Sequence, residues 1–101
     1  MAKGYWIAHV DVTDPEGYKA YVAANAAAFA EFGARFLVRG GVSQVKAGAP
    51  KSRHVVIEFE DYATALACYE SPAYRRAMLL RDAASLVDLV VVEGYDGPQP
   101  G

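Results

Sequence analysis

The side chains best suited to chemistry in this sequence are four ionisable groups that interrupt apolar segments: His9, Arg39, Glu58 and Glu93. An imidazole titrates near neutral pH and serves as a general base when a carboxylate orients it. A guanidinium offers a planar fork of donors to a carboxylate or a developing enolate. Brought together, these groups would suit proton abstraction from an enolisable or phenolic small molecule.

Each of these residues also has a purely structural interpretation. His9 can be a hydrogen-bonded histidine packed at a subunit interface. Arg39 can form an ion pair with Glu58 or Glu93 that sets the register of a sheet. The sequence leaves open which glutamate would partner His9 or Arg39, so their chemistry depends on the elements that position them.

All four residues fall in segments rich in β-branched and aromatic residues, which predict strands. A helix is predicted over residues 14–33, because Asp14-Pro15 is a typical helix start and Gly33 a typical helix end. The predicted strands cover residues 5–12, 34–40, 53–60 and 86–95.

The second helical segment follows the third strand and is interrupted. It begins at Asp61, and Ser71-Pro72 breaks it, because a proline inside a helix removes a backbone hydrogen bond. Ser71 as cap and Pro72 as first residue start a new helix. The order strand, helix, strand, strand, helix, strand predicts a ferredoxin-like α+β fold with four antiparallel strands and the helices on one face. We expect one domain over residues 1–96 and a flexible tail over 97–101.

Alternation along each strand separates a wholly apolar row from a mixed row. A mixed row that is half aliphatic and half polar suits neither plain solvent nor a dry core. A second copy packed face to face, with a polar cavity inside, satisfies both conditions, so a homodimer is expected and further association of dimers stays open. The rows expected under the helices are Trp6, Ala8, Val10; Phe36, Val38; Val55, Ile57, Phe59; and Val90, Val92. The rows expected on the uncovered face place His9, Arg39, Glu58 and Glu93 among Ile7, Leu37, Val56, Leu89 and Val91.

Composition narrows the class of partner. The chain has 101 residues, a net charge of −2 and a pI near 5.6, which gives no electrostatic footprint for nucleic acid. RNA-binding sheets stack bases on aromatic residues, whereas the third strand offers His54, Val56 and Glu58 on its uncovered row. The N-terminal segment matches neither a signal peptide nor a membrane span, so no membrane partner and a cytoplasmic location are expected.

The motifs predict no cofactor and no metal. The chain has no GxGxxG, no GxxxxGK and no HExxH. Cys68 is the only cysteine, which excludes an internal disulfide and a cysteine-cluster metal site. Its alanine-rich helical setting predicts a small buried hydrophobe rather than a nucleophile.

Asn25 lies within an apolar stripe of the first predicted helix, formed by Tyr18, Val22, Phe29 and Phe32. A buried amide must find hydrogen bonds, because an unpartnered polar group is costly in an apolar setting. Its partner can be the broken second helix or a ligand, and the sequence leaves both open.

Several stretches carry a resemblance to a known family: GYWIAHVDVTDPEGYKAYV, GARFLVRGG, VVIEF, CYESPAYRRA and DLVVVEGYDG. They resemble an uncharacterised domain-of-unknown-function family in the dimeric α/β-barrel superfamily. The resemblance covers nearly the whole chain and implies a ferredoxin-like subunit and a face-to-face dimer. The superfamily includes cofactor-free monooxygenases, muconolactone-type isomerases and haem enzymes. The haem branches take an axial histidine from a helix, whereas His9 and His54 fall on predicted strands, so haem is not expected.

The resemblance also suggests that Tyr18, Ser71 and Tyr74 rim the mouth of a cavity, where they would bind a ligand together with Asn25. Ser71 is already explained as a helix cap, and tyrosines commonly serve as core. The function expected is binding of a small molecule, with cofactor-independent isomerase-like or monooxygenase-like proton abstraction as its catalytic form. The alternative is a non-catalytic metabolite-binding or sensing module, and the sequence does not separate the two.

Overall fold

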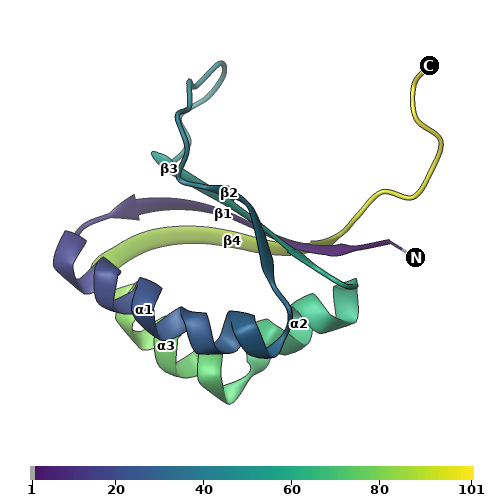
Figure 1. The fold of residues 1–101 in the computed structure, drawn as a ribbon. Helices are drawn as coiled ribbons and strands as arrows, with labels where there is room; N and C mark the ends of the chain where they lie inside the picture. The colour runs from purple at the N-terminus through teal and green to yellow at the C-terminus, as the bar shows by residue number, and fades with distance from the viewer. Residues whose placement is uncertain (1) are drawn as a thin grey trace.

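The computed structural model describes residues 2–101 and contains a four-stranded antiparallel sheet with the helices on one face (Figure 1). The strands lie in the order β2-β3-β1-β4. The predicted ferredoxin-like fold is confirmed, and so is the break in the second helical segment, which forms two separate helices. The elements are β1 (Gly4–Val12), α1 (Pro15–Glu31), β2 (Arg35–Arg39), β3 (Arg53–Phe59), α2 (Tyr62–Glu70), α3 (Pro72–Ala84) and β4 (Ser85–Glu93).

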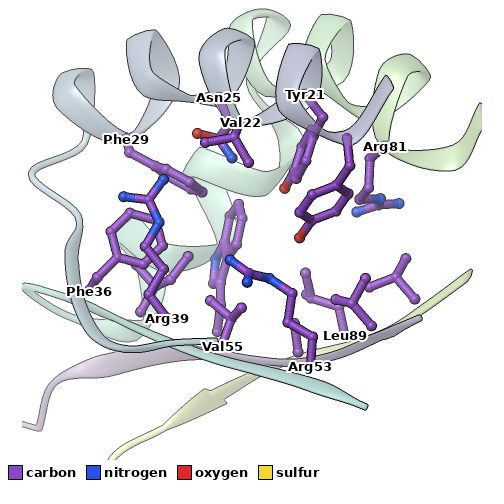
Figure 2. A pocket seen from close by; sticks show the side chains of 16 residues that line it. Tyr21, Val22, Asn25, Phe29, Phe36, Arg39, Arg53, Val55, Arg81 and Leu89 are labelled. Atoms are coloured by element: carbon purple, nitrogen blue, oxygen red, sulfur yellow. The ribbon is translucent and has the colours of Figure 1, made fainter. Parts of the chain in front are cut away.

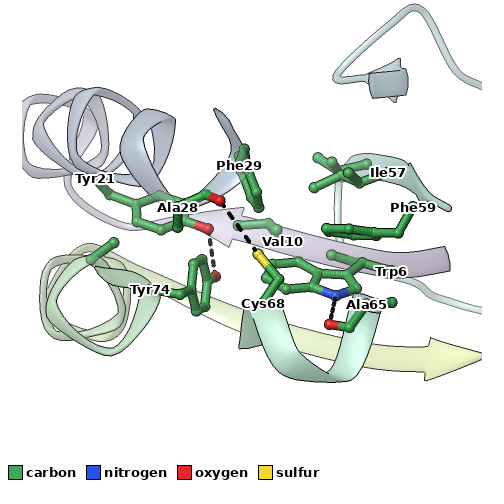
Figure 3. Packing of buried hydrophobic residues seen from close by; sticks show 13 residues of the cluster. Trp6, Val10, Tyr21, Ala28, Phe29, Ile57, Phe59, Ala65, Cys68 and Tyr74 are labelled. Atoms are coloured by element: carbon green, nitrogen blue, oxygen red, sulfur yellow. Dashed lines mark hydrogen bonds between the residues drawn. The ribbon is translucent and has the colours of Figure 1, made fainter. Parts of the chain in front are cut away.

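Trp6, in the first half of β1, anchors the core. Its side chain is 1% exposed, and its indole Nε1 donates a hydrogen bond to the backbone oxygen of Ala65 in α2 at 2.8 Å (Figure 3). Four rings surround the indole with centroid distances of 4.8 to 5.4 Å, those of Phe29, Phe59, Tyr69 and Tyr74. Tilted and edge-to-face aromatic pairs bury a large apolar area in favourable orientations. The indole therefore ties the helix layer to the sheet.

Cys68 is buried in the same core, as predicted. Its thiol lies 3.9 Å from the backbone oxygen of Ala28 in α1 (Figure 3). Burial raises the pKa of Cys68 to about 12. The thiol is therefore protonated at neutral pH and is not a nucleophile.

The helix starts follow the predicted positions but not always the predicted bonds. Asp61 caps α2, since its carboxylate accepts a hydrogen bond from the backbone N–H of Thr64 at 2.8 Å, which lowers the pKa of Asp61. Asp14 occupies the cap position of α1, but its side chain makes no capping bond. The helix nevertheless begins at Pro15, whose fixed φ suits the first turn.

Ser71 joins α2 to α3. Its hydroxyl accepts a hydrogen bond from the backbone N–H of Tyr74 at 3.1 Å and donates one to the backbone oxygen of Cys68 at 2.7 Å. The side chain is 6% exposed, so water cannot readily replace either bond. One hydroxyl thus closes the end of one helix and opens the next.

The predicted orientation of β4 is wrong. Val87, Leu89 and Val91 pack against the core, where they pair with Val10, Ala8 and Trp6 of β1. Val90 is 53% exposed and Val92 38% exposed, and they pair with Ile7 and Tyr5 on the side of the sheet opposite the core. Both rows of this strand are apolar over most of its length, so composition alone could not choose between them.

The predicted orientation of Arg39 in β2 is also wrong, because the pairing with β3 shifts register between Phe36 and Val38. Phe36 pairs with Ile57, while Arg39 pairs with Val55, and both partners are buried under the helices. A β-bulge inserts one unpaired residue and reverses the side on which the following side chains point. Phe36 and Arg39 therefore both face the helix layer.

Replacing Ser71 by alanine should destabilise the fold, because it removes the α3 cap and leaves the backbone N–H of Tyr74 without its partner. We expect Ser71→Ala to lower the free energy of unfolding by about 1–2 kcal/mol in urea denaturation. Ser43→Ala, at an exposed loop position, is the matched control and should leave the midpoint unchanged. Equal midpoints for the two variants would contradict this role of Ser71.

Candidate functional site

The four side chains selected for chemistry are not brought together. His9 and Glu58 lie on the uncovered face, but Tyr5 pairs with Glu58 and His54 pairs with His9 across the same two strands. The His9–His54 pair lies four residues along β1 from the Tyr5–Glu58 pair, which corresponds to about 13 Å along the strand. No cavity containing all four predicted residues is therefore formed on this face of the protomer.

His9 forms a close pair with His54. Their Nδ1 atoms lie 2.8 Å apart, a hydrogen bond in which one ring donates to the other, and the rings meet edge to face. Glu58 accepts a hydrogen bond from the Tyr5 hydroxyl at 3.2 Å and lies 4.0 Å from the Arg35 guanidinium. His9 is thus not oriented by Glu58.

Arg39 and Glu93 leave the predicted group for different reasons. The bulge in β2 turns Arg39 toward the helices. Glu93 pairs with Gly4 at the end of β4, in the row of Leu89 and Val91, and its side chain is exposed. Neither residue faces His9.

A pocket lies instead between α1 and the sheet (Figure 2). Its cavity volume is about 30 Å³, room for roughly two water molecules at ~10–15 Å³ each. The whole recess out to the solvent measures about 500 Å³. Its walls are mostly apolar, with polar groups at a few points. The lining residues are Trp6, Ala8, Val10, Tyr18, Tyr21, Val22, Asn25, Phe29, Phe36, Arg39, Arg53, Val55, Ile57, Arg81, Val87 and Leu89.

Two arginines from neighbouring strands point into this pocket (Figure 2). The Arg39 guanidinium lies 3.9 Å from the ring centroid of Phe36, and the Arg53 guanidinium lies 5.5 Å from that of Tyr18. Neither forms an ion pair within residues 2–101. None of the sixteen lining residues is an aspartate or glutamate, so the pocket carries uncompensated positive charge.

Two polar atoms of the lining are buried without a hydrogen-bond partner: Nε of Arg53 and Oδ1 of Asn25. Asn25 is 4% exposed and lies on the face of α1 that covers the pocket (Figure 2). A buried donor or acceptor without a partner is costly, so such atoms call for an explanation. Of the two partners predicted for Asn25, no bond to the second helical segment satisfies its oxygen.

Gly40 fixes the path of Arg53. Its φ of +67 lies in the left-handed region, and a Cβ at this position would meet the Arg53 guanidinium. Its backbone N–H donates to the backbone oxygen of His54 at 2.9 Å. Glycine is therefore required both by the backbone conformation and by the close approach of the arginine.

The third arginine, Arg81 of α3, is already satisfied. Its Nη1 donates to the hydroxyls of Tyr69 and Tyr74 at 3.2 Å each, and its Nε donates to Asp82 at 3.0 Å. The Tyr74 hydroxyl also lies 2.7 Å from that of Tyr21 (Figure 3). Burial raises the pKa of both Tyr21 and Tyr74, so these phenols are neutral.

The predicted ligand-binding residues separate into two groups. Tyr18 and Asn25 line the pocket. Tyr74 is fully buried in the core, and Ser71 is the buried cap of α3, so neither rims the mouth. Arg53 was missed, although it continues the inward row of Val55 and Ile57 in β3, a signal that strand alternation already contains.

A family model matches residues 3–95, and its description is a domain of unknown function, DUF1330. The chain belongs to the DUF1330 family. No functionally curated protein matches it. The resemblance to an uncharacterised domain-of-unknown-function family is therefore confirmed.

Solved structures share the fold of this DUF1330 chain at low sequence identity. RPA0582 from Rhodopseudomonas palustris, a protein of unknown function, is 17% identical with a TM-score of 0.76, over 95% of this chain and 85% of that one. SnoaB from Streptomyces nogalater, a cofactor-independent oxygenase, is 14% identical with a TM-score of 0.63, over 99% and 97%. An antibiotic biosynthesis monooxygenase is 16% identical with a TM-score of 0.54, over 97% and 100%. The chain thus shares its ferredoxin-like fold with these proteins.

Among residues 2–101, no three or more histidine, cysteine, aspartate or glutamate side chains gather in a way that could hold a metal ion. No helix of the described chain has the length and apolar character needed to cross a membrane.

Replacing Gly40 by alanine should displace Arg53. We expect Gly40→Ala to lower the free energy of unfolding by about 1–2 kcal/mol, because alanine is strained at positive φ. Gly41→Ala is the matched control, since a Cβ there meets nothing within 4 Å. Urea denaturation measures the stabilities, and a ¹⁵N spectrum of the arginine Nε–H groups reports the displacement. An unchanged Arg53 resonance in Gly40→Ala would contradict this role.

Proposed function

We propose that this DUF1330 domain binds a small organic molecule in the pocket between α1 and the sheet. The observation that supports this most strongly is the combination of two unpaired guanidinium groups and one unpartnered amide oxygen above an apolar floor. Ligand sites are typically apolar recesses with a few convergent polar groups. Arg39 and Arg53 project from the strands and α1 supplies the opposite wall (Figure 2).

Binding without turnover is the form of this function that the geometry favours. The pocket has no histidine or carboxylate in its lining, and its buried Tyr21 has a raised pKa, so no general base faces a ligand there. His9, the predicted base, lies on the opposite face of the sheet from Arg39. The protein would then act as a metabolite-binding or sensing module.

Cofactor-independent oxygenation is the second candidate, and the fold shared with SnoaB favours it. In this case the ligand itself has to be acidic enough to lose a proton to solvent, because the pocket offers no base. Arg39 and Arg53 would stabilise the resulting phenolate or enolate. Dioxygen would add to a carbon atom of that anion to form a hydroperoxide, which loses water and leaves one oxygen atom on the ligand as a carbonyl group.

A homodimer through the uncovered face forms part of the same proposal. This face exposes several aliphatic side chains, including Val38 at 41%, Leu86 at 60% and Val90 at 53%. Val38 and Val90 flank the half-buried Ile7 and Val56 of the central strands, and Leu86 lies farther along β4, opposite Asp11. Contiguous exposed apolar surface of this kind typically marks an interface, and closed two-fold dimers are the commonest homo-oligomers.

Native mass spectrometry of the freshly purified protein tests ligand binding directly. We expect a non-covalent adduct that is lost in Val22→Trp, because the larger side chain fills the recess, and kept in the exposed control Leu79→Trp. An unchanged adduct mass after long aerobic incubation supports binding, whereas a gain of oxygen supports the second candidate. An adduct that survives Val22→Trp would place the ligand elsewhere.

Sedimentation velocity tests the dimer. We expect the wild-type protein to sediment as a dimer at micromolar concentration and Val90→Glu as a monomer, because each two-fold interface then buries two unpaired carboxylates. Leu79→Glu, on an exposed site of α3 at 75% exposure, should remain dimeric. A monomeric wild-type protein would refute this part of the proposal.

A further inference from the structure

We infer that the ligand of the pocket is a carboxylate with a flat apolar body and a separate hydroxyl donor, held by Arg39, Arg53 and Asn25. This inference rests on the proposed binding function and adds to it the chemical class of the ligand. It follows from three features of the lining: its charge, its one free acceptor and the shape of its walls.

The charge of the lining requires an anion. Of its three arginines, Arg81 already donates to two tyrosines and Asp82, whereas Arg39 and Arg53 rest only on aromatic rings. The Nε of Arg53 is buried and has no acceptor. A carboxylate supplies acceptors to adjacent guanidinium donors and forms the strongest class of protein hydrogen bond with them. Binding of an anion would therefore satisfy a donor that the free protein leaves unpaired.

The acceptor at Asn25 requires a donor on the ligand. Its Oδ1 is buried and unpartnered, and the carboxylate that satisfies the arginines cannot also donate to it. A hydroxyl group can, and a site built to bond a hydroxyl discriminates strongly against an analogue that lacks one. The ligand thus has two polar groups of opposite hydrogen-bonding character.

The walls between these polar groups favour a flat apolar body. Phe29 and Phe36 meet edge to face with centroids 5.4 Å apart, and Val87 and Leu89 supply aliphatic floor. An additional ring would extend this aromatic packing. The cavity volume of about 30 Å³ in the free protein is smaller than such a ring, and the exposed Arg39 side chain is the part of the lining that we expect to move as the ligand enters. Long arginine side chains can change rotamer without disturbing the sheet.

Calorimetric titration with a matched set of probes tests the inference. 4-Hydroxyphenylacetate carries both polar groups, phenylacetate lacks the hydroxyl, tyrosol replaces the carboxylate by a neutral alcohol, and phenyl phosphate carries a different anion. We expect 4-hydroxyphenylacetate to bind the wild-type protein about tenfold or more tightly than either tyrosol or phenylacetate. The comparison within the wild-type protein does not depend on whether any variant folds.

Variants then assign each contact. Arg53→Met should weaken the binding of 4-hydroxyphenylacetate about tenfold or more and leave the binding of tyrosol unchanged. Arg76→Met, at an exposed site of α3, should change neither affinity. Asn25→Ala should bring the affinities of 4-hydroxyphenylacetate and phenylacetate together. If Arg53→Met and Arg76→Met lower the affinity for 4-hydroxyphenylacetate equally, the loss is due to the overall charge of the protein, and the inference is overturned.

The remaining outcomes separate this inference from the proposed function. If tyrosol binds as tightly as 4-hydroxyphenylacetate and Val22→Trp abolishes the binding of both, the pocket is a ligand site but its ligand need not be an anion. This result would overturn the inference and leave the proposed function standing. If phenyl phosphate binds more tightly than 4-hydroxyphenylacetate, the anionic group of the ligand is a phosphate rather than a carboxylate, and the inference is overturned. Absence of binding by all four probes, while a co-purified adduct responds to Val22→Trp, would overturn the ligand class alone.

Discussion

Burial of Trp6 is the constraint on which the rest of this structure depends. The indole donates its only hydrogen-bonding group to α2 and is packed among four aromatic rings, so β1 has a single orientation that satisfies it. Since β1 pairs with β3 on one side and β4 on the other, Trp6 also fixes which residues of those strands face inward. Ile57 and Val91, its direct partners, lie on the same side of the sheet.

The pocket exists because the helix layer is not equally close to every part of the sheet. The broken segment places α2 against β1, while α1 packs chiefly along α3. Small residues allow this close helix pairing, as at Gly17, where a Cβ would lie 3.1 Å from that of Ala84. The space left between α1 and the strands is occupied by Arg39 and Arg53 rather than by further aliphatic side chains (Figure 2).

The two faces of the sheet carry different kinds of polar group. On the helix-covered side, Arg39 and Arg53 have no carboxylate partner, whereas the uncovered side holds paired groups: His9 with His54, Glu58 with Tyr5, and Lys51 with Asp88 at 2.6 Å. Paired groups tolerate enclosure by a second subunit, because each retains a partner when water leaves. Unpaired cations instead attract a ligand that supplies the missing charge.

Sequence by itself determined the order of the elements, the break at Ser71-Pro72, the burial of Cys68 and the faces of β1 and β3. Those features rest on local chemistry: a proline in a helix, a serine that caps, and strands whose two rows differ clearly in polarity. The family resemblance was readable for the same reason, since it follows contiguous stretches of residues.

Only the tertiary structure decided where Arg39 and Glu93 point, and therefore that Arg39 lines the candidate pocket together with Arg53. Both rows of β4 are apolar, so its facing depends on its pairing with β1 rather than on its own residues. In β2, one unpaired residue between Phe36 and Val38 reverses the alternation, and nothing in the local sequence requires that bulge. Register is a property of two strands together, and for that reason alternation within single strands placed Arg39 and the two rows of β4 on the wrong faces.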